Sequence, residues 1–230
     1  MRPSLAQRGV AECLGTAFLL AGVVGSGIMA AKLAGGNGAV ALLCNTLATG
    51  AILTVMILTF GPISGAHFNP AVSIALALRR ELPARVAVLY IGVQVIGGIA
   101  GVWAAHLMFE LPLWQVSATV RSGPGQWLAE AVATFGLLLT ILGTRSAYAV
   151  GLYITAAYWF TASTSFANPA VTIARALSDT YAGIAPAGVL AFIAAQILGA
   201  LAAVALGRWL WPEQDIDPPQ RQFGRANDTA

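Results

Sequence analysis

Charged side chains are scarce in this sequence: Asp, Glu, Lys and Arg make up 9% of its 230 residues, whereas a soluble domain carries about 25%. Hydrophobic residues make up 58% and the mean hydropathy is +0.77. Composition therefore predicts a protein that lies in a lipid bilayer. The formal net charge is only +3 and is spread along the chain, which argues against a nucleic-acid-binding surface.

Residues that carry enzymatic or metal chemistry are also scarce. The chain has two Cys and two His. Cys13 and Cys44 fall inside apolar segments, and no Cys or His cluster has the spacing of metal ligands. There is no nucleophile beside a base and no Gly-rich phosphate loop after a strand. We therefore expect no enzyme, no cofactor and no metal site. Residues 10–31 are long enough to span a bilayer, so we do not expect a cleavable signal peptide.

One short motif occurs twice, as Asn69-Pro70-Ala71 and as Asn168-Pro169-Ala170. Asn is a strong helix N-cap, and Pro at the first helical position gives up an N–H that would have no partner anyway. Each motif therefore predicts the start of a helix, over about 69–80 and 168–178. About ten helical residues span roughly 15 Å, half of a ~30 Å hydrocarbon core. We expect two re-entrant half-helices.

Six longer apolar segments predict membrane spans, over about 10–31, 39–60, 84–108, 127–142, 148–162 and 185–210. The order of features recurs: Glu12 and Glu130 lie early in the first and fourth spans, and Gln94 and Gln196 lie in the third and sixth. The first three spans and the last three spans form the two halves of this repeat. Because three is an odd number, the second half must be upside down in the membrane relative to the first. The predicted fold is an all-α membrane protein with six transmembrane helices plus two re-entrant half-helices in an inverted repeat.

The whole chain, 1–230, is predicted to form a single channel domain, with repeat one over about 8–108 and repeat two over about 127–210. Residues 211–230 are predicted to be a cytoplasmic tail. If both termini are cytoplasmic, nine of the twelve Lys and Arg residues lie inside, and only Lys32, Arg121 and Arg175 lie outside. The positive-inside rule favours that orientation.

The motifs also predict chemistry at the centre of the membrane. Helix N-termini carry partial positive charge and disfavour cations. If the oxygens of Asn69 and Asn168 cap their helices, their NH₂ groups can donate to a passing solute. Glu12 and Glu130 are ionisable groups in apolar spans, so a proton-coupled carrier could use them. Their symmetric placement favours a role in anchoring the re-entrant loops. His67 either lines the pore mouth or holds its loop.

Residues 64–72 read Ser-Gly-Ala-His-Phe-Asn-Pro-Ala-Val, and the paired motifs fall in a six-span inverted repeat. Over residues 8–210 the chain resembles the major intrinsic protein family, the aquaporins and aquaglyceroporins. The resemblance implies a homotetramer in the lipid bilayer of the inner (plasma) membrane. Each subunit would hold one pore that passes small neutral solutes passively. A membrane-junction protein with little conduction is the least favoured alternative, because the loops are short.

The second motif departs from the family pattern. Val171 stands where the family usually has Arg, and Thr172 stands where glycerol channels often have Asp. The resemblance assigns the remaining selectivity-filter positions, carried over by their spacing from the two motifs, to Thr49, Ala156 and the backbone of Ser165. These residues are small and uncharged, which predicts a constriction wider than that of a water-selective channel.

Arg175 lies one helical turn beyond Val171. It could serve as a vestibule residue that takes over the filter role, or extend toward water, and Asp179 could pair with it. The Asn-Pro-Ala-Val motif is similar to that of bacterial members associated with arsenic resistance. That similarity implies arsenite and antimonite hydroxides, besides glycerol-like polyols, as solutes. A water-selective aquaporin is the alternative within the class.

Overall fold

The computed structural model describes residues 3–212 of the chain. In chain order the helices of these residues are α1 (Leu5–Leu33), α2 (Gly38–Ser64), α3 (Pro70–Leu78), α4 (Ala84–Met108), α5 (Pro124–Thr144), α6 (Ala147–Phe160), α7 (Pro169–Arg175) and α8 (Pro186–Leu210). Residues 3–212 contain no strand. The predicted all-α fold is confirmed. The predicted tail falls almost entirely outside the described residues.

Five of the helices, α1, α2, α4, α5 and α8, are long and apolar enough to cross a membrane. Helix α6 has 14 residues, or about 21 Å at 1.5 Å per residue, which is short of a ~30 Å hydrocarbon core. The expectation that α6 completes a set of six spans therefore stays a prediction.

Helix α2 extends further than the sequence predicted. We expected the second span to end near residue 60, but the helix continues through Pro62 to Ser64. Pro removes one backbone donor from a helix without preventing the following residues from remaining helical. The helix ends at Gly65, whose φ of 92° is a left-handed conformation that glycine adopts without steric cost.

The two short helices begin where the Asn-Pro-Ala motifs predicted. Asn69 Oδ1 accepts a hydrogen bond from the backbone N–H of Ala71 at 2.9 Å, and each motif's Pro is the first helical residue. Asn168 Oδ1 accepts from the N–H of Ala170 at 3.0 Å and of Val171 at 3.2 Å. Helix α7 ends at Arg175, earlier than predicted.

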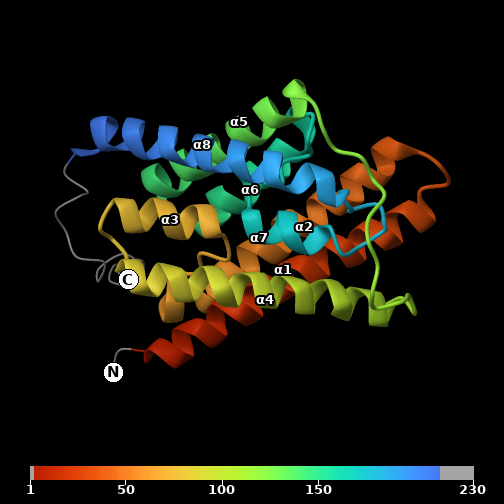
Figure 1. The fold of residues 1–230 in the computed structure, drawn as a ribbon, viewed down its shortest axis with the longest axis horizontal. Coiled ribbons are helices and arrows are strands. Elements are labelled where there is room, and N and C mark those ends of the chain that lie inside the picture. The colour runs from red at the N-terminus through yellow and green to blue at the C-terminus, as the bar shows by residue number, and fades with distance from the viewer. Residues whose placement is uncertain (1–2, 213–230) are drawn as a thin grey trace, which may run out of the picture.

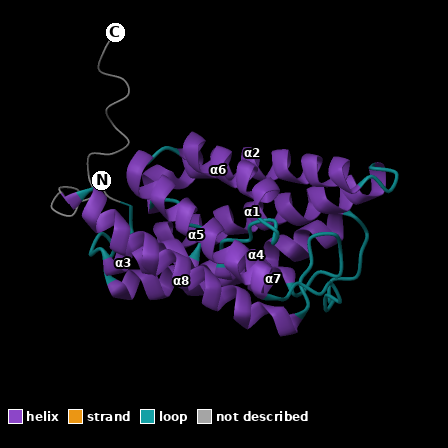
Figure 2. Cartoon of the chain, turned by 90° about the horizontal axis from the view of Figure 1, so that it is seen from above, coloured by secondary structure: helices purple, strands orange, loops and turns teal. Residues whose placement is uncertain are grey.

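Figure 1 shows how these short helices are enclosed: α3 and α7 lie between α4 on one side and α8 on the other. Helix α1 packs against both α4 and α2, and α5 packs against α8. Seen from above, α2 and α6 lie side by side along the upper edge of the view (Figure 2). The loops that precede α3 and α7 are therefore held in the interior of the bundle.

Candidate functional site

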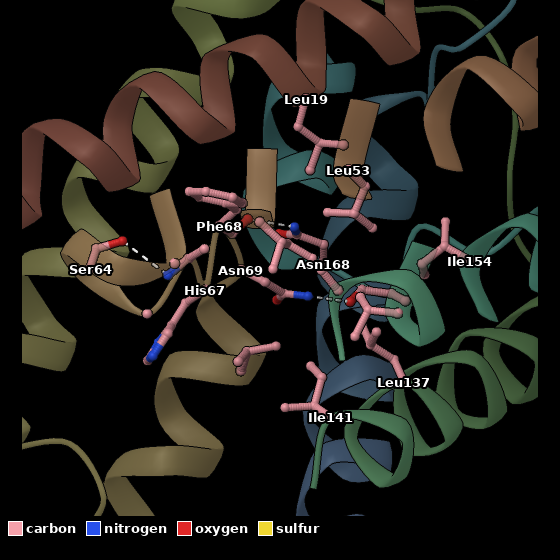
Figure 3. Close-up of a pocket in the computed structure, with 18 of the residues that line it drawn as sticks. Leu19, Leu53, Ser64, His67, Phe68, Asn69, Leu137, Ile141, Ile154 and Asn168 are labelled. Carbon is pink, nitrogen blue, oxygen red and sulfur yellow. Dashed lines mark hydrogen bonds between the residues drawn. The ribbon is translucent and has the colours of Figure 1, made fainter. Parts of the chain in front are cut away.

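The two Asn-Pro-Ala motifs meet through their side chains. Asn69 Nδ2 donates a hydrogen bond to the carbonyl oxygen of Ala167, and Asn168 Nδ2 donates to that of Phe68, each at 2.8 Å. Figure 3 shows both Asn side chains at the centre of a cavity. An Asn amide has two N–H donors. One N–H of each Asn joins the two loops, and the other is left for the cavity.

Glu12 holds the loop that precedes α3. Its Oε1 accepts hydrogen bonds from the hydroxyl of Ser64 at 2.6 Å and the backbone N–H of His67 at 2.9 Å. Its Oε2 accepts from the N–H of Phe68 and from Gln94 Nε2, both at 2.8 Å. The side chain is fully buried. The carboxylate thus accepts hydrogen bonds from loop N–H and O–H groups that would otherwise have no partner inside the bundle. A carboxylate forms stronger hydrogen bonds than a neutral acceptor.

Glu130 makes the equivalent contacts with the loop that precedes α7. Its carboxylate accepts from the backbone N–H groups of Phe166 and Ala167, both at 2.8 Å, and from Gln196 Nε2 at 2.6 Å. It is also fully buried, and neither Glu12 nor Glu130 lines the cavity. In this arrangement each carboxylate is hydrogen-bonded to a loop and stays outside the cavity lining.

Both loops have unusual backbone conformations. Ala66 and Phe68 have φ values of 51° and 49°, and Ser165 and Ala167 have values of 51° and 46°. Such left-handed conformations are rare for residues other than glycine, and they persist only where surrounding contacts impose them. The hydrogen bonds from the two loops to buried carboxylates supply those contacts.

The cavity between the motifs has a volume of about 820 Å³. Much of its wall is apolar; Leu137, Ile141 and Ile154 lie on one side of the Asn pair (Figure 3). Asn69 and Asn168 are the polar groups at its centre. An apolar wall with a few polar groups is typical of a site that passes or binds small molecules.

His67 lines one end of this cavity and also holds its loop, so both alternatives drawn from the sequence describe part of its role. Its Nδ1 lies 3.0 Å from the hydroxyl of Ser73, and its ring packs edge-to-face on Tyr90 with the centroids 5.2 Å apart. The Tyr90 hydroxyl donates to the carbonyl of Ser64 and accepts from Arg8 Nε. Arg8 also lines the cavity at this end.

The residues assigned to the selectivity filter are only partly brought together. Thr49, Ser165 and Val171 are buried and line the α7 half of the cavity. Ala156 does not: it lies on the exposed side of α6, and this helix lines the cavity with residues that include Ile154 and Tyr158. At 100° per residue, position 156 points away from the face shared by 154 and 158. Counting back from the motif therefore misplaced Ala156.

Arg175 lines the cavity and is 2% exposed, so it does not extend toward water. Its Nε donates to the carbonyl of Ala182, and its guanidinium lies 3.4 Å from the centre of the Phe166 ring. Within residues 3–212 Asp179 forms no ion pair with it, and accepts from the backbone N–H of Ala118 instead. The possible pairing of Arg175 with Asp179 is therefore not formed.

A second guanidinium stacks on the same aromatic ring. Arg121, in the loop before α5, lies 5.1 Å from the Phe166 ring centre and donates from Nε to the carbonyl of Gly183 at 2.8 Å. Burial of the guanidinium, the largest influence, lowers the pKa of Arg121. No sequence pattern indicated this contact, because Arg121 is 45 residues from Phe166 in the chain. In the part of the chain that the structure describes, no three His, Cys, Asp or Glu side chains could hold a metal ion.

An all-α bundle of apolar, membrane-length helices around a cavity, with two short helices meeting inside it, defines a multi-pass membrane channel. Comparison with known proteins gives the family. Residues 1–148 match the model of the major intrinsic protein family, and the chain belongs to that family. It is thus a channel for small solutes.

Two curated relatives and one solved structure illustrate the likeness. Over 212 residues the chain is 56% identical to Aquaglyceroporin AqpS of Rhizobium meliloti (strain 1021), covering 90% of this chain and 91% of the relative. It is 30% identical over 234 residues to a probable NIP-type aquaporin of Nicotiana alata, covering 96% and 82%. The structure of the aquaglyceroporin from Plasmodium falciparum matches with a TM-score of 0.70 and 22% identity, over 93% of this chain and 100% of that one. At this identity the last match shows the fold.

Proposed function

We propose that this channel passes small uncharged solutes that carry hydroxyl groups. The solutes are glycerol-like polyols and hydroxides of the arsenite and antimonite type, together with water. The observation that carries the proposal is Val171, an uncharged side chain in the cavity wall directly after the second motif. The resemblance places Arg there in most members of the family. Val171 leaves more room and offers no charge to a solute.

The chemistry of the cavity supports hydroxylated solutes. Asn69 and Asn168 each keep one N–H after joining the two loops, and both residues line the cavity. A hydroxyl group can accept from either donor while its carbon skeleton contacts the apolar wall. The relative that is 56% identical to this chain is named an aquaglyceroporin. Arsenite-type hydroxides have the shape and neutrality of small polyols, and the Asn-Pro-Ala-Val motif favours them.

Arg175 is proposed to supply the positive charge that the position of Val171 lacks. It lies one helical turn further along α7, is fully buried, and lines the same cavity. A guanidinium held in a low-dielectric wall repels cations strongly. The positive ends of α3 and α7 act in the same direction. Cations are therefore excluded without an Arg at position 171.

The arrangement of the subunit in the membrane also belongs to this proposal. The protein lies in the inner membrane of the cell, with both termini in the cytoplasm. Four copies associate, as in the family. The Lys and Arg distribution supports the orientation.

A water-selective aquaporin is the second candidate, because Tyr158 places an aromatic ring in the half of the cavity where Ala156 was expected. A carrier that uses Glu12 or Glu130 has less support, since both carboxylates are fully hydrogen-bonded away from the cavity.

The Val171→Arg variant tests the proposal in proteoliposomes. We expect it to reduce glycerol and arsenite entry more than water entry, because a long cationic side chain narrows the constriction for the larger solutes first. The matched control is Val171→Leu, which adds volume without charge. Unchanged selectivity in Val171→Arg would contradict the proposal.

A further inference from the structure

His106 is a fully buried histidine that does not line the cavity. It lies in the last turn of α4. We propose that His106 is a positioning residue for Arg175, because it fixes the loop after α7, and this loop holds the guanidinium in place. The inference rests on the proposed function in one respect: Arg175 is taken to exclude cations from the channel.

The position of the Arg175 guanidinium depends on the loop after α7. Within residues 3–212 the group donates one hydrogen bond, from Nε to the carbonyl of Ala182, and Nη1 has no partner. The Phe166 ring attracts the charge but offers no hydrogen-bond acceptor. The place of the charge in the cavity wall is therefore set by where the Ala182 carbonyl lies.

His106 holds the turn that carries Ala182. Its Nε2 lies 3.0 Å from Ser178 Oγ, which in turn lies 2.9 Å from Thr180 Oγ1. The backbone N–H of Gly183 donates to the carbonyl of Thr180 at 2.9 Å, which closes the turn around Ala182. A series of hydrogen bonds thus runs from α4 to the turn that holds the guanidinium.

The other nitrogen of the same imidazole holds a second loop, 109–123. Its Nδ1 lies 3.2 Å from the carbonyl oxygen of Leu113, and because a carbonyl only accepts, Nδ1 is the donor. The two loops also bond directly, since the N–H of Ala185 donates to the carbonyl of Thr119 at 2.7 Å. Figure 1 shows both loops at the same end of the bundle. One side chain of a long apolar helix therefore fixes both loops.

Two conservative variants separate this role from that of a residue that only fills space. Asn places its amide where the imidazole has Nδ1, whereas the longer Gln places its amide where the imidazole has Nε2. His106→Asn therefore keeps the contact with Leu113 and loses the contact with Ser178, and His106→Gln does the reverse. If His106 only filled space, its variants would differ in stability, and the cation permeability would not follow the contact with Ser178.

The experiment measures sodium entry into proteoliposomes with a sodium-sensitive dye, relative to water entry by stopped-flow light scattering. We expect His106→Ala and His106→Asn to raise the sodium-to-water ratio about fivefold, the factor that corresponds to one hydrogen bond of ordinary net strength. His106→Gln should keep the wild-type ratio. The matched control is Leu107→Ala, at the adjacent and exposed position of α4, which should also keep it.

A double variant tests whether His106 acts through Arg175. Arg175→Met removes the charge itself, so adding His106→Ala to it should raise the sodium-to-water ratio no further. Two independent effects would instead multiply. This comparison uses the same vesicles and the same dye as the single variants.

Hydrogen–deuterium exchange of the segment 176–185 reports on the loop without reference to ions. Backbone amides exchange faster where a segment opens more often. In the detergent-solubilised protein, exchange of this segment should rise about fivefold in His106→Asn, because one hydrogen bond of ordinary net strength is lost. It should stay at the wild-type rate in His106→Gln. These two variants keep the proposal testable if His106→Ala does not fold.

Equal sodium-to-water ratios in His106→Asn and His106→Gln, in a channel that leaks when Arg175 becomes Met, would overturn the inference. A double variant that leaks more than Arg175→Met would overturn the action through Arg175. Failure of the proposed function is a separate result: Arg175→Met would then admit no sodium. In that case exchange decides, and equal exchange of 176–185 in His106→Asn and His106→Gln would overturn the positioning role, whereas faster exchange in His106→Asn alone would support it.

Discussion

Replacing Glu12 by Gln tests whether the buried carboxylates position the loops or couple transport to protons. The carboxylate accepts four hydrogen bonds, two on each oxygen, and one bond on each oxygen comes from a backbone N–H. Gln replaces one oxygen with an NH₂ group. Whichever way the amide is oriented, its NH₂ faces the N–H of either His67 or Phe68.

The expected loss of stability follows from the number of backbone N–H groups that lose their acceptor. One buried backbone donor without a partner costs about 1–3 kcal/mol, so Glu12→Gln should lower stability by about that amount. Glu12→Ala frees both backbone donors and should cost about 2–6 kcal/mol before any cost of the cavity it leaves. Glu130→Gln should resemble Glu12→Gln, because it too deprives one loop N–H, that of Phe166 or Ala167, of its acceptor.

The assay is thermal unfolding of the detergent-solubilised protein, combined with solute entry into proteoliposomes with and without a pH gradient. We expect the order of Tm values to be wild type, then Glu12→Gln, then Glu12→Ala, with no effect of the gradient on any of them. Wild-type stability in Glu12→Gln would refute the anchoring role. Gradient-driven uptake that disappears in a stably folded Glu12→Gln would support a proton-coupled carrier instead.

Two further predictions concern charge in the pathway. Arg175→Met removes the buried guanidinium while keeping much of the length of the side chain, so a cation leak should appear, measured by conductance or a sodium-sensitive dye. Arg175→Lys keeps the charge and should leak less. Equal cation permeability of the wild type and both variants would contradict the role given to Arg175. Asn168→Asp keeps the capping oxygen but places a carboxylate oxygen against the Phe68 carbonyl that now accepts at 2.8 Å. It should lower stability by about 1–3 kcal/mol and slow water entry, and unchanged Tm and flux would show that the contact between the loops is unimportant.

Much of the fold could be predicted because it depends on local rules. Asn-Pro specifies a helix start through capping and the geometry of Pro, and α3 and α7 begin at Pro70 and Pro169 as those rules require. Apolar length identified the long spans. The end of α2 was missed because Pro62 disfavours a helix but does not forbid one, and α2 continues through it to Ser64.

The candidate site was less predictable where it depends on how distant segments meet. Ala156 was placed by counting back from Asn168 through residues 161–167, which are not helical, so the count did not fix which face of α6 points inward. For Arg175 the sequence left two alternatives open, a vestibule residue that takes over the filter role and a side chain that extends toward water. Its burial requires the Ala182 carbonyl and the Phe166 ring, and neither contact follows from its own neighbours in the sequence.

The solute selectivity of the unmodified channel is best measured by stopped-flow light scattering on proteoliposomes, comparing water, glycerol and uncharged arsenite. We expect glycerol and arsenite to enter these proteoliposomes far faster than they enter protein-free vesicles. The proposed route is the cavity whose wall includes Val171, directly after the second motif. Fast water entry with glycerol and arsenite entry no faster than in protein-free vesicles would contradict the proposed function.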